Sequence, residues 1–316
     1  LLGRLGRRGL LGGELSLDVA LARKAIEERV AAPLGLTVET AAFGIIRVAN
    51  ANMVRAVRSV SVQRGYDPRR FALVAFGGAG PMHAVAVARE LGIRTVLVPP
   101  SPGVLCAVGM LTMPIRTDMV QTLLLQANPA SVPASAKAVA DLQREANGWL
   151  DLQGARGGGR QMEIRLDMRY RGQNYELQVR GFDPSTETGM QQAVEEFHRV
   201  HQQAYGYAAS DRPVEVVNVR ISAATAAPSQ HGVAGTQEAG GRSAEHAPIE
   251  IRPVLWAEGQ RFHQTPVFAR AAFSPGARLT GPAILEQVDS TIVLPPAVIA
   301  VADAAGNILI DVLAET

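Results

Sequence analysis

Three glycines within four residues, in Gly77-Gly78-Ala79-Gly80, form the stretch of this sequence best suited to ligand binding. Without side chains, the backbone can turn sharply and come within contact distance of a bound molecule. Pro81 follows where a first helical turn tolerates a missing N–H group, so the free N–H groups of that turn face the loop. Such groups favour the phosphate or adenosine part of a nucleotide, and a structural turn is the alternative.

Two side chains near this loop can do chemistry. His83 lies just inside the following helix, where an imidazole can donate a hydrogen bond to phosphate or act as an acid or base. The structural alternative is a half-buried histidine bonded to the backbone. Cys106, the only cysteine, has apolar neighbours that disfavour a thiolate, so we expect it in the core. A single cysteine forms no internal disulfide bond and indicates a reducing, cytoplasmic compartment.

Glu195, His198 and His201 are spaced three residues apart on a predicted helix. Glu-x-x-His is a two-metal element when two copies face each other, and this sequence has one copy. We therefore expect a solvated helical face and no metal site. Asn50 and Asn52 stand on a largely apolar predicted helix, where they either line a cleft or cap and turn the chain.

The elements around the glycines predict a strand, loop, helix and strand. Residues 71–76 are a short apolar run typical of a fully buried strand, a helix is expected over 82–91, and a second buried strand over 95–98. This order implies a parallel pair of strands with a right-handed crossover. Ligands bind such sheets at the carboxyl ends of the strands, which is where the glycines lie.

The rest of the chain predicts more helices and strands. Helices are expected over 20–30, capped by Ser16 or Asp18, and over 38–64, 135–152 and 188–205. The residues of the second helix expected to be buried are Ala42, Ile45, Ile46, Ala49, Met53, Val57 and Val60. Residues 103–110 are expected to pack beneath the glycine loop. Strands are expected over 123–125, 164–168, 175–179, 214–223, 249–256, 265–269, 281–286, 290–294 and 308–312.

Composition and patterning predict two domains in a soluble protein. The first covers residues 1–122 and the second 123–316, with a mobile linker at about 224–248 that is rich in Ala, Gly, Ser and Thr. A net charge of +2 is too small to indicate a nucleic-acid partner. Every long apolar stretch is interrupted before the ~20 residues that a membrane span needs. We expect neither nucleic acid nor a membrane as a partner.

Five segments together resemble the hydantoinase A / 5-oxoprolinase family, which also includes acetone carboxylase subunits. They are FGGAGPMHA (76–84), SPGVLCAVGML (101–111), RYRGQNYEL (169–177), FHRVHQQAYGY (197–207) and GPAILEQVDSTIVLPP (281–296). The resemblance covers nearly the whole chain but only the C-terminal half of the family. The last segment departs from the family at Ala297-Val298, where Gly-Trp usually follows the prolines. The resemblance implies an α/β fold, with part of an actin-like (ribonuclease H-like) ATPase lobe followed by an α+β, strand-rich C-terminal domain.

The resemblance also implies a function. Family members use ATP with Mg²⁺ or another divalent cation to open cyclic amides such as hydantoin or 5-oxoproline, by phosphorylating the carbonyl oxygen for attack by water. The nucleotide-binding residues are then Gly77, Gly78, Ala79, Gly80, Pro81 and His83. The implied partner, in an oligomeric enzyme, is a hydantoinase B-type subunit or domain. Alternatives are an acetone carboxylase-type subunit and a catalytically silent partner-binding fragment.

The catalytic residues cannot be assigned from this sequence. Actin-like ATPases need an Asp-x-Gly-Gly-Thr phosphate loop and a second acidic motif, and neither occurs within residues 1–76. In the family these motifs lie upstream. We therefore expect a part of a longer protein, which starts here at Leu1 without Met and is inactive alone, and we expect ATP and the cation to bind only when the upstream half is present.

Overall fold

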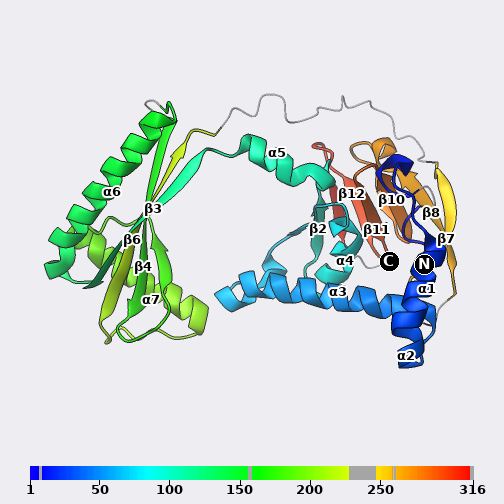
Figure 1. The fold of residues 1–316 in the computed structure, drawn as a ribbon, viewed down its shortest axis with the longest axis horizontal. Coiled ribbons are helices and arrows are strands. Elements are labelled where there is room, and N and C mark those ends of the chain that lie inside the picture. The colour runs from blue at the N-terminus through cyan, green and yellow to red at the C-terminus, as the bar shows by residue number, and fades with distance from the viewer. Residues whose placement is uncertain (7–8, 156–158, 228–246, 258, 260, 314–316) are drawn as a thin grey trace. The chain divides into compact units, whose positions relative to one another are not determined.

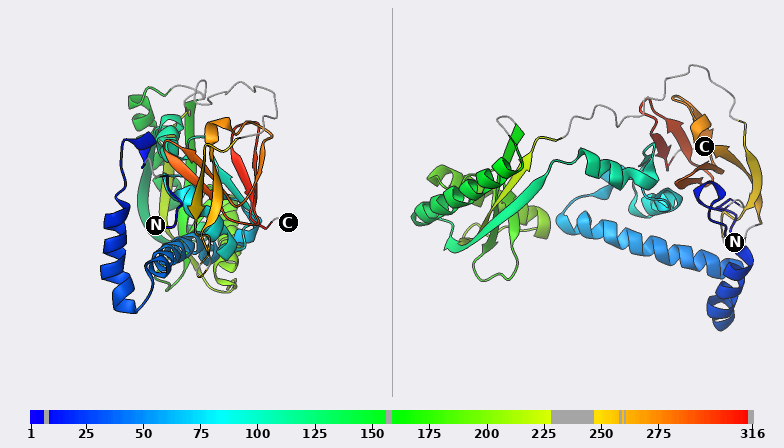
Figure 2. Two further views of the ribbon diagram at one scale, coloured as in Figure 1. Left: turned by 90° about the vertical axis from the view of Figure 1, so that its right-hand side faces the viewer. Right: turned by 45° about the horizontal axis from the view of Figure 1, so that its top comes forward.

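The computed structural model describes residues 1–6, 9–155, 159–227, 247–257, 259 and 261–313. The chain divides into two compact units (Figures 1 and 2). Unit 1 comprises Leu1–Gly109 and Gly232–Thr316, and unit 2 comprises Met110–His231. The predicted division placed one boundary after residue 122. In the structure, residues from both ends of the chain belong to unit 1, because β2 (Thr95–Val98) pairs with β13 (Ile308–Asp311). Residues 228–246 of the predicted linker lie outside the described residues.

The α-helices of unit 1 up to the first helix after the glycine loop come from residues 19–91. They are α1 (Val19–Ile26), α2 (Ala32–Leu34), α3 (Val38–Val60) and α4 (Gly80–Leu91). α1 begins at Asp18, whose carboxylate accepts a hydrogen bond from the backbone N–H of Leu21 at 2.8 Å. Thr37 caps α3 in the same way, by accepting from the N–H of Thr40. The helices predicted over 20–30 and 38–64 are confirmed. Each begins at a side-chain cap that directly precedes its apolar run.

The buried stripe predicted on α3 is largely wrong. Ile45, Met53 and Val60 are exposed, whereas Ala42 is buried as expected. The other buried residues of α3 are Ala41, Phe43, Asn50 and Val54. α3 packs against α4 and against the N-terminal helices over different parts of its length, so no single stripe of constant phase is covered (Figure 1).

Unit 1 contains a five-stranded sheet and a four-stranded sheet. The first has the order β1 (Leu73–Val74), β2 (Thr95–Val98), β13 (Ile308–Asp311), β12 (Ile299–Ala302) and β9 (Arg278–Thr280). The second has the order β11 (Ser290–Leu294), β10 (Ala283–Gln287), β8 (His263–Ala269) and β7 (Glu250–Val254). α4 packs against β2 and β11, and its buried residues join both sheets in one core. Figure 1 shows α4 beside these strands.

The predicted strand, loop, helix and strand are confirmed, with β1 parallel to β2. The prediction of a fully buried first strand is wrong. β1 contains only two residues and lies at the edge of its sheet, where Phe71, Val74 and Phe76 are exposed and Ala75 is buried. An edge strand has a neighbour on one side only, so its apolar side chains are less covered.

The segment predicted to pack beneath the glycine loop forms α5 (Leu105–Thr112) instead. α5 is described throughout, and none of its residues is buried. Cys106 is therefore exposed, and its predicted core position is wrong. The apolar run carries the chain out of unit 1, and only Pro102, just before α5, is buried near the loop.

Unit 2 is an antiparallel sheet with two helices. The sheet has the order β3 (Arg116–Gln126), β6 (Val214–Thr225), β4 (Arg160–Tyr170) and β5 (Leu177–Arg180), and the helices are α6 (Val132–Leu152) and α7 (Glu187–Tyr205). Side chains from both helices meet the inward residues of β4 and β6 in one core, which includes Leu150, Tyr170, Phe197 and Ile221. The predicted hairpin of β4 and β5 is confirmed.

No single helix among the described residues is both long enough and apolar enough to span a membrane. Residues 19–34 and 38–64 reach that length and apolarity only as a pair, and that pair is bent by 91°.

The fully buried ring of Phe197 predicts a large stability effect confined to unit 2. We expect Phe197→Ala to lower the free energy of unfolding of unit 2 by about 3–5 kcal/mol, because the core loses the ring and keeps a cavity. Urea unfolding followed by Trp149 fluorescence measures this, in a Trp256→Phe background that removes the other of the two tryptophans. The exposed Phe71→Ala is the control, with an expected change within about 0.5 kcal/mol. Equal effects of the two variants would contradict the assigned core.

Candidate functional site

The glycine loop lies at the surface of unit 1. Gly78 and Ala79 are exposed, Gly77 and Gly80 are half-buried, and Pro81 is buried at the start of α4. Gly77 has a φ of +82°, and a Cβ built there meets no atom within 4 Å. No side chain caps the start of α4. The loop therefore presents backbone to an open space, with the first turn of the helix beside it.

His83 is half-buried one turn into α4 and is bonded to Asn50 of α3. Its Nδ1 lies 2.8 Å from the side-chain oxygen of Asn50, which is itself buried. Because that oxygen accepts, Nδ1 carries the proton and Nε2 keeps a lone pair. The alternative of a backbone partner for His83 is replaced by this side-chain partner, whereas Asn52 is exposed and takes no part.

Two effects disfavour a charged His83. Burial lowers the pKa of its imidazole, and the positive charge of Arg4 lowers it further. The Arg4 guanidinium stacks over the ring of Phe43, with 5.7 Å to the ring centroid. Sequence reasoning missed Arg4, because nothing local connects the first residues of the chain to α4.

Two hollows flank α3 and α4. The smaller, of about 160 Å³, adjoins the loop and is lined by Met53 and Val57 of α3, by Phe76, and by Gly80 and His83. The larger, of about 580 Å³, is lined by Arg47 and Asn50 of α3 and Glu90 of α4, among others. The bonded pair Asn50 and His83 thus contributes one residue to each hollow. The hollow next to the glycine loop has largely apolar walls.

A turn from the C-terminal strands also reaches the loop. Asp289, between β10 and β11, accepts a hydrogen bond from the backbone N–H of Gly103 at 2.8 Å. A Cβ built on Gly78 would lie 3.4 Å from the backbone oxygen of Asp289. Gly103 lies 186 positions from Asp289 in the chain, so this hydrogen bond joins two distant segments.

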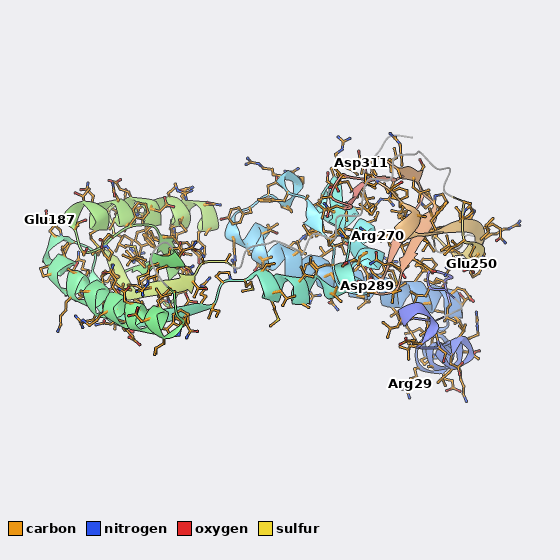
Figure 3. All side chains as sticks on the ribbon, turned by 90° about the horizontal axis from the view of Figure 1, so that it is seen from above. Arg29, Glu187, Glu250, Arg270, Asp289 and Asp311 are labelled. Carbon is orange, nitrogen blue, oxygen red and sulfur yellow. The ribbon has the colours of Figure 1, made fainter. Side chains whose placement is uncertain are left out.

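Arg270, behind this turn, is buried and bonded to backbone oxygens. Its Nη2 donates to the carbonyl oxygens of Val98 at 3.2 Å and Gly306 at 2.9 Å. Arg270 and Asp289 are both labelled in Figure 3. Burial lowers its pKa to about 10, against the opposing effect of the Asp289 carboxylate. Arg270 therefore stays charged at neutral pH and ties the two sheets of unit 1 together. No motif in the sequence had singled it out.

Models of two protein families match the sequence along almost all of its length. The first, described as hydantoinase/oxoprolinase, matches residues 1–119, and the second, described as the hydantoinase/oxoprolinase C-terminal domain, matches residues 129–309. The chain belongs to the hydantoinase/oxoprolinase family. The predicted resemblance is thereby confirmed.

The chain is similar to three enzymes of the hydantoinase/oxoprolinase family. Caprolactamase subunit alpha of Pseudomonas jessenii is 34% identical over 93% of this chain and 43% of that protein. 5-Oxoprolinase 1 of Arabidopsis thaliana is 30% identical over 94% and 24%, and the acetone carboxylase beta subunit of Xanthobacter autotrophicus is 28% identical over 93% and 42%. The chain thus spans less than half the length of each of these relatives.

Solved structures of hydantoinase/oxoprolinase-type proteins share the fold. ATP-dependent caprolactamase from Pseudomonas jessenii superposes with a TM-score of 0.83 at 30% identity, over 98% of this chain and 45% of that one. Nucleotide-free acetone carboxylase superposes with a TM-score of 0.68 at 23% identity, over 98% and 45%, which shows similarity of fold alone. The predicted α/β class with an actin-like lobe is confirmed.

The histidines of α7 are structural in this hydantoinase/oxoprolinase family member. His198 Nδ1 lies 2.8 Å from the hydroxyl of Tyr170, and the buried His201 bonds the carbonyl oxygen of Tyr207 at 2.8 Å. The expected solvated face is correct for the exposed Glu195 and wrong for both histidines. Within the described part of the chain, no group of three or more His, Cys, Asp or Glu side chains is placed to hold a metal ion.

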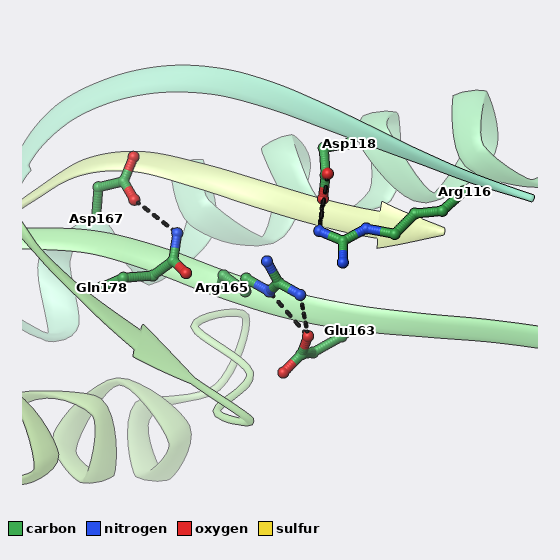
Figure 4. A network of polar contacts seen from close by, with 6 residues as sticks. All are labelled: Arg116, Asp118, Glu163, Arg165, Asp167 and Gln178. Atoms are coloured by element: carbon green, nitrogen blue, oxygen red, sulfur yellow. Dashed lines mark hydrogen bonds and ion pairs between the residues drawn. The ribbon is translucent and has the colours of Figure 1, made fainter. Parts of the chain in front are cut away.

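The outer face of the sheet in unit 2 carries paired charges (Figure 4). Arg116 pairs with Asp118 and Arg165 with Glu163. The buried Asp167 accepts from Gln178, Asn218 and Arg220, the last at 2.7 Å. Exposed ion pairs such as Arg116–Asp118 contribute little to stability. Because each of these side chains has a partner on the same face, we assign the network to the sheet and not to a ligand site.

The lowered pKa of His83 predicts an acid-sensitive unit 1. Below pH ~6.5 the unfolded chain binds a proton more readily than the folded one, so the free energy of unfolding falls as pH drops toward the folded-state pKa. Above pH ~6.5 this contribution is constant, because the imidazole is neutral in both states. We expect His83→Gln to reduce this acid dependence, measured by urea unfolding at several pH values and followed by Trp256 fluorescence in a Trp149→Phe background.

The matched control is His263→Gln, which changes an exposed histidine in the same unit. It is expected to keep the pH dependence of the wild type. An unchanged pH dependence in His83→Gln would contradict the lowered pKa of His83.

Proposed function

We propose that this chain forms the adenosine-facing part of an ATP-dependent enzyme that opens cyclic amides. The observation that carries the proposal is the exposed glycine loop next to a hollow of about 160 Å³ with largely apolar walls. A purine ring fits an apolar hollow by burying its faces, while backbone N–H groups meet its polar atoms. A loop with only a packing role would be covered by other residues, and Gly78 and Ala79 are not.

His83 then acts as a hydrogen-bond acceptor and not as a cation. Its Nδ1 proton is held by Asn50, so Nε2 can accept from a ribose hydroxyl or an adenine amino group. This favours the adenosine part of the ligand over phosphate at this residue. Bound ATP supplies the phosphoryl group that activates the amide carbonyl. The described residues contain no cluster of metal ligands, and we assign the divalent cation to the upstream half of the enzyme.

A cyclic amide is the proposed substrate class because of the relatives. Both identity and TM-score are higher for caprolactamase, whose name denotes a lactam substrate, than for acetone carboxylase. Both relatives are named as subunits, which supports a partner subunit of the hydantoinase B type. The rest of the enzyme, including the catalytic carboxylates, is assigned to an upstream half.

Calorimetry on the full-length protein tests the proposal. We expect ATP to bind, and we expect ADP release to depend on hydantoin, 5-oxoproline or caprolactam when the partner subunit is present. ADP release that depends instead on acetone and bicarbonate would favour the carboxylase alternative. Absence of ATP binding to the full-length protein would overturn the nucleotide site.

A second prediction separates a nucleotide contact at the loop from backbone strain. Gly77 and Gly35 have φ values of +82° and +65°, and a Cβ at either position meets no atom within 4 Å. Replacing either by Ala strains a left-handed backbone by about 1–2 kcal/mol. We expect Gly77→Ala also to weaken ATP binding by roughly tenfold, because the methyl group enters the space beside the loop.

Gly35→Ala is the matched control, because Gly35 ends α2 away from the loop. Thermal unfolding is expected to give the two variants similar losses of stability, and calorimetry is expected to show wild-type ATP affinity for Gly35→Ala. Wild-type affinity in Gly77→Ala would contradict the contact.

A further inference from the structure

Three segments of unit 1 lie together at the glycine loop, and the Asp289 carboxylate links two of them directly. The segments are the loop itself (77–80), the connection after β2 (99–103) and the turn between β10 and β11, which contains Asp289. Asp289 Oδ2 accepts from the backbone N–H of Gly103 at 2.8 Å. Its other oxygen accepts from the side-chain amide of Gln287.

The turn and the connection approach too closely for any side chain between them. A Cβ built on Gly103 would lie 2.6 Å from both the backbone oxygen and Oδ2 of Asp289. Side-chain Nε2 of Gln287 also donates to the carbonyl oxygen of Pro100 at 3.3 Å. The C-terminal turn therefore holds the connection at two points, Pro100 and Gly103.

The connection in turn holds the glycine loop. The backbone N–H of Gly77 donates to the carbonyl oxygen of Pro102 at 2.7 Å. Gly77 is the residue with positive φ at which the chain leaves β1, so this bond fixes the direction of the loop. Pro102 is buried and offers a rigid acceptor.

We propose that Asp289 is a positioning residue that sets the shape of the glycine loop through the 99–103 connection. The inference rests on the proposed function, since the shaped loop is the one assigned to the nucleotide. Asp289 does not touch the ligand in this proposal. It acts through Gly103, and Gly103 acts through Pro102.

The pattern of donors explains why a carboxylate stands at this position. Asp289 accepts from two donors, the Gly103 N–H and the Gln287 amide, and a carboxylate has acceptor capacity on both oxygens. An Asn side chain has one accepting oxygen and one donating nitrogen. Gln287 would have to turn its oxygen toward that nitrogen and so lose the bond to Pro100.

Hydrogen exchange and nucleotide affinity test the inference together. In Asp289→Ala, without nucleotide, we expect the amide of Gly77 to exchange about ten- to hundredfold faster, as follows from the loss of a charge-assisted hydrogen bond. We expect ATP affinity of the full-length protein to fall by roughly tenfold, measured well below the unfolding temperature. Asp289→Asn is expected to give the same changes to a smaller degree.

The matched control is Asp18→Ala. Asp18 also accepts a backbone N–H at 2.8 Å, from Leu21, but it caps α1 away from the loop. Asp18→Ala is expected to leave both the exchange of Gly77 and the ATP affinity unchanged, whatever it does to the unfolding temperature.

The two measurements separate failure of the inference from failure of the proposed function. Wild-type exchange at Gly77 in Asp289→Ala overturns the inference, whether or not ATP binds. Faster exchange with wild-type ATP affinity also overturns it, because the loop shape would then not matter to the ligand. Faster exchange in a full-length protein that binds no ATP keeps the link between turn and loop and rejects the nucleotide site.

Discussion

The antiparallel pairing of β13 with β2 is the interaction on which the rest of unit 1 depends. It joins Thr95 to Asp311 and Val98 to Ile308, residues that are more than two hundred positions apart in the chain. Arg94 and Asp311 form an ion pair at one end of this pairing, at 2.9 Å. The pair is exposed and contributes little stability by itself, so the buried side chains of β2 and β13 hold the strands together.

This pairing brings residues from the C-terminal part of the chain, including Asp289, close to the glycine loop. Side chains of the second sheet share one core with β2, β13 and α4, and the turn at Asp289 reaches Gly103. Arg270 binds carbonyl oxygens from β2 and from the β12 to β13 turn, and so resists sliding of one sheet over the other. The position of the glycine loop therefore depends on contacts between residues that are far apart in the chain.

Elements that are determined by neighbouring residues were predicted correctly from the sequence. The glycine loop, α4 and the β4 to β5 hairpin follow from apolar spacing, caps and turn residues, and these predictions are confirmed. The partners of Asp289 and His83 could not be predicted, because Gly103 and Asn50 come from other parts of the chain. β9 and β12 were missed, since each is a short run that becomes a strand only by pairing. Cys106 was placed wrongly because an apolar run was taken as buried.

The split of unit 1 by unit 2 has a consequence for synthesis on the ribosome. β2 emerges long before β13, and at roughly 5–20 residues per second the intervening chain takes on the order of tens of seconds to make. During that time the side of β2 that later pairs with Ile308–Asp311 has no partner strand from this sheet. An open strand edge is a template for pairing with another chain. Until residues 308–311 are made, that edge of β2 is therefore open to pairing with other chains.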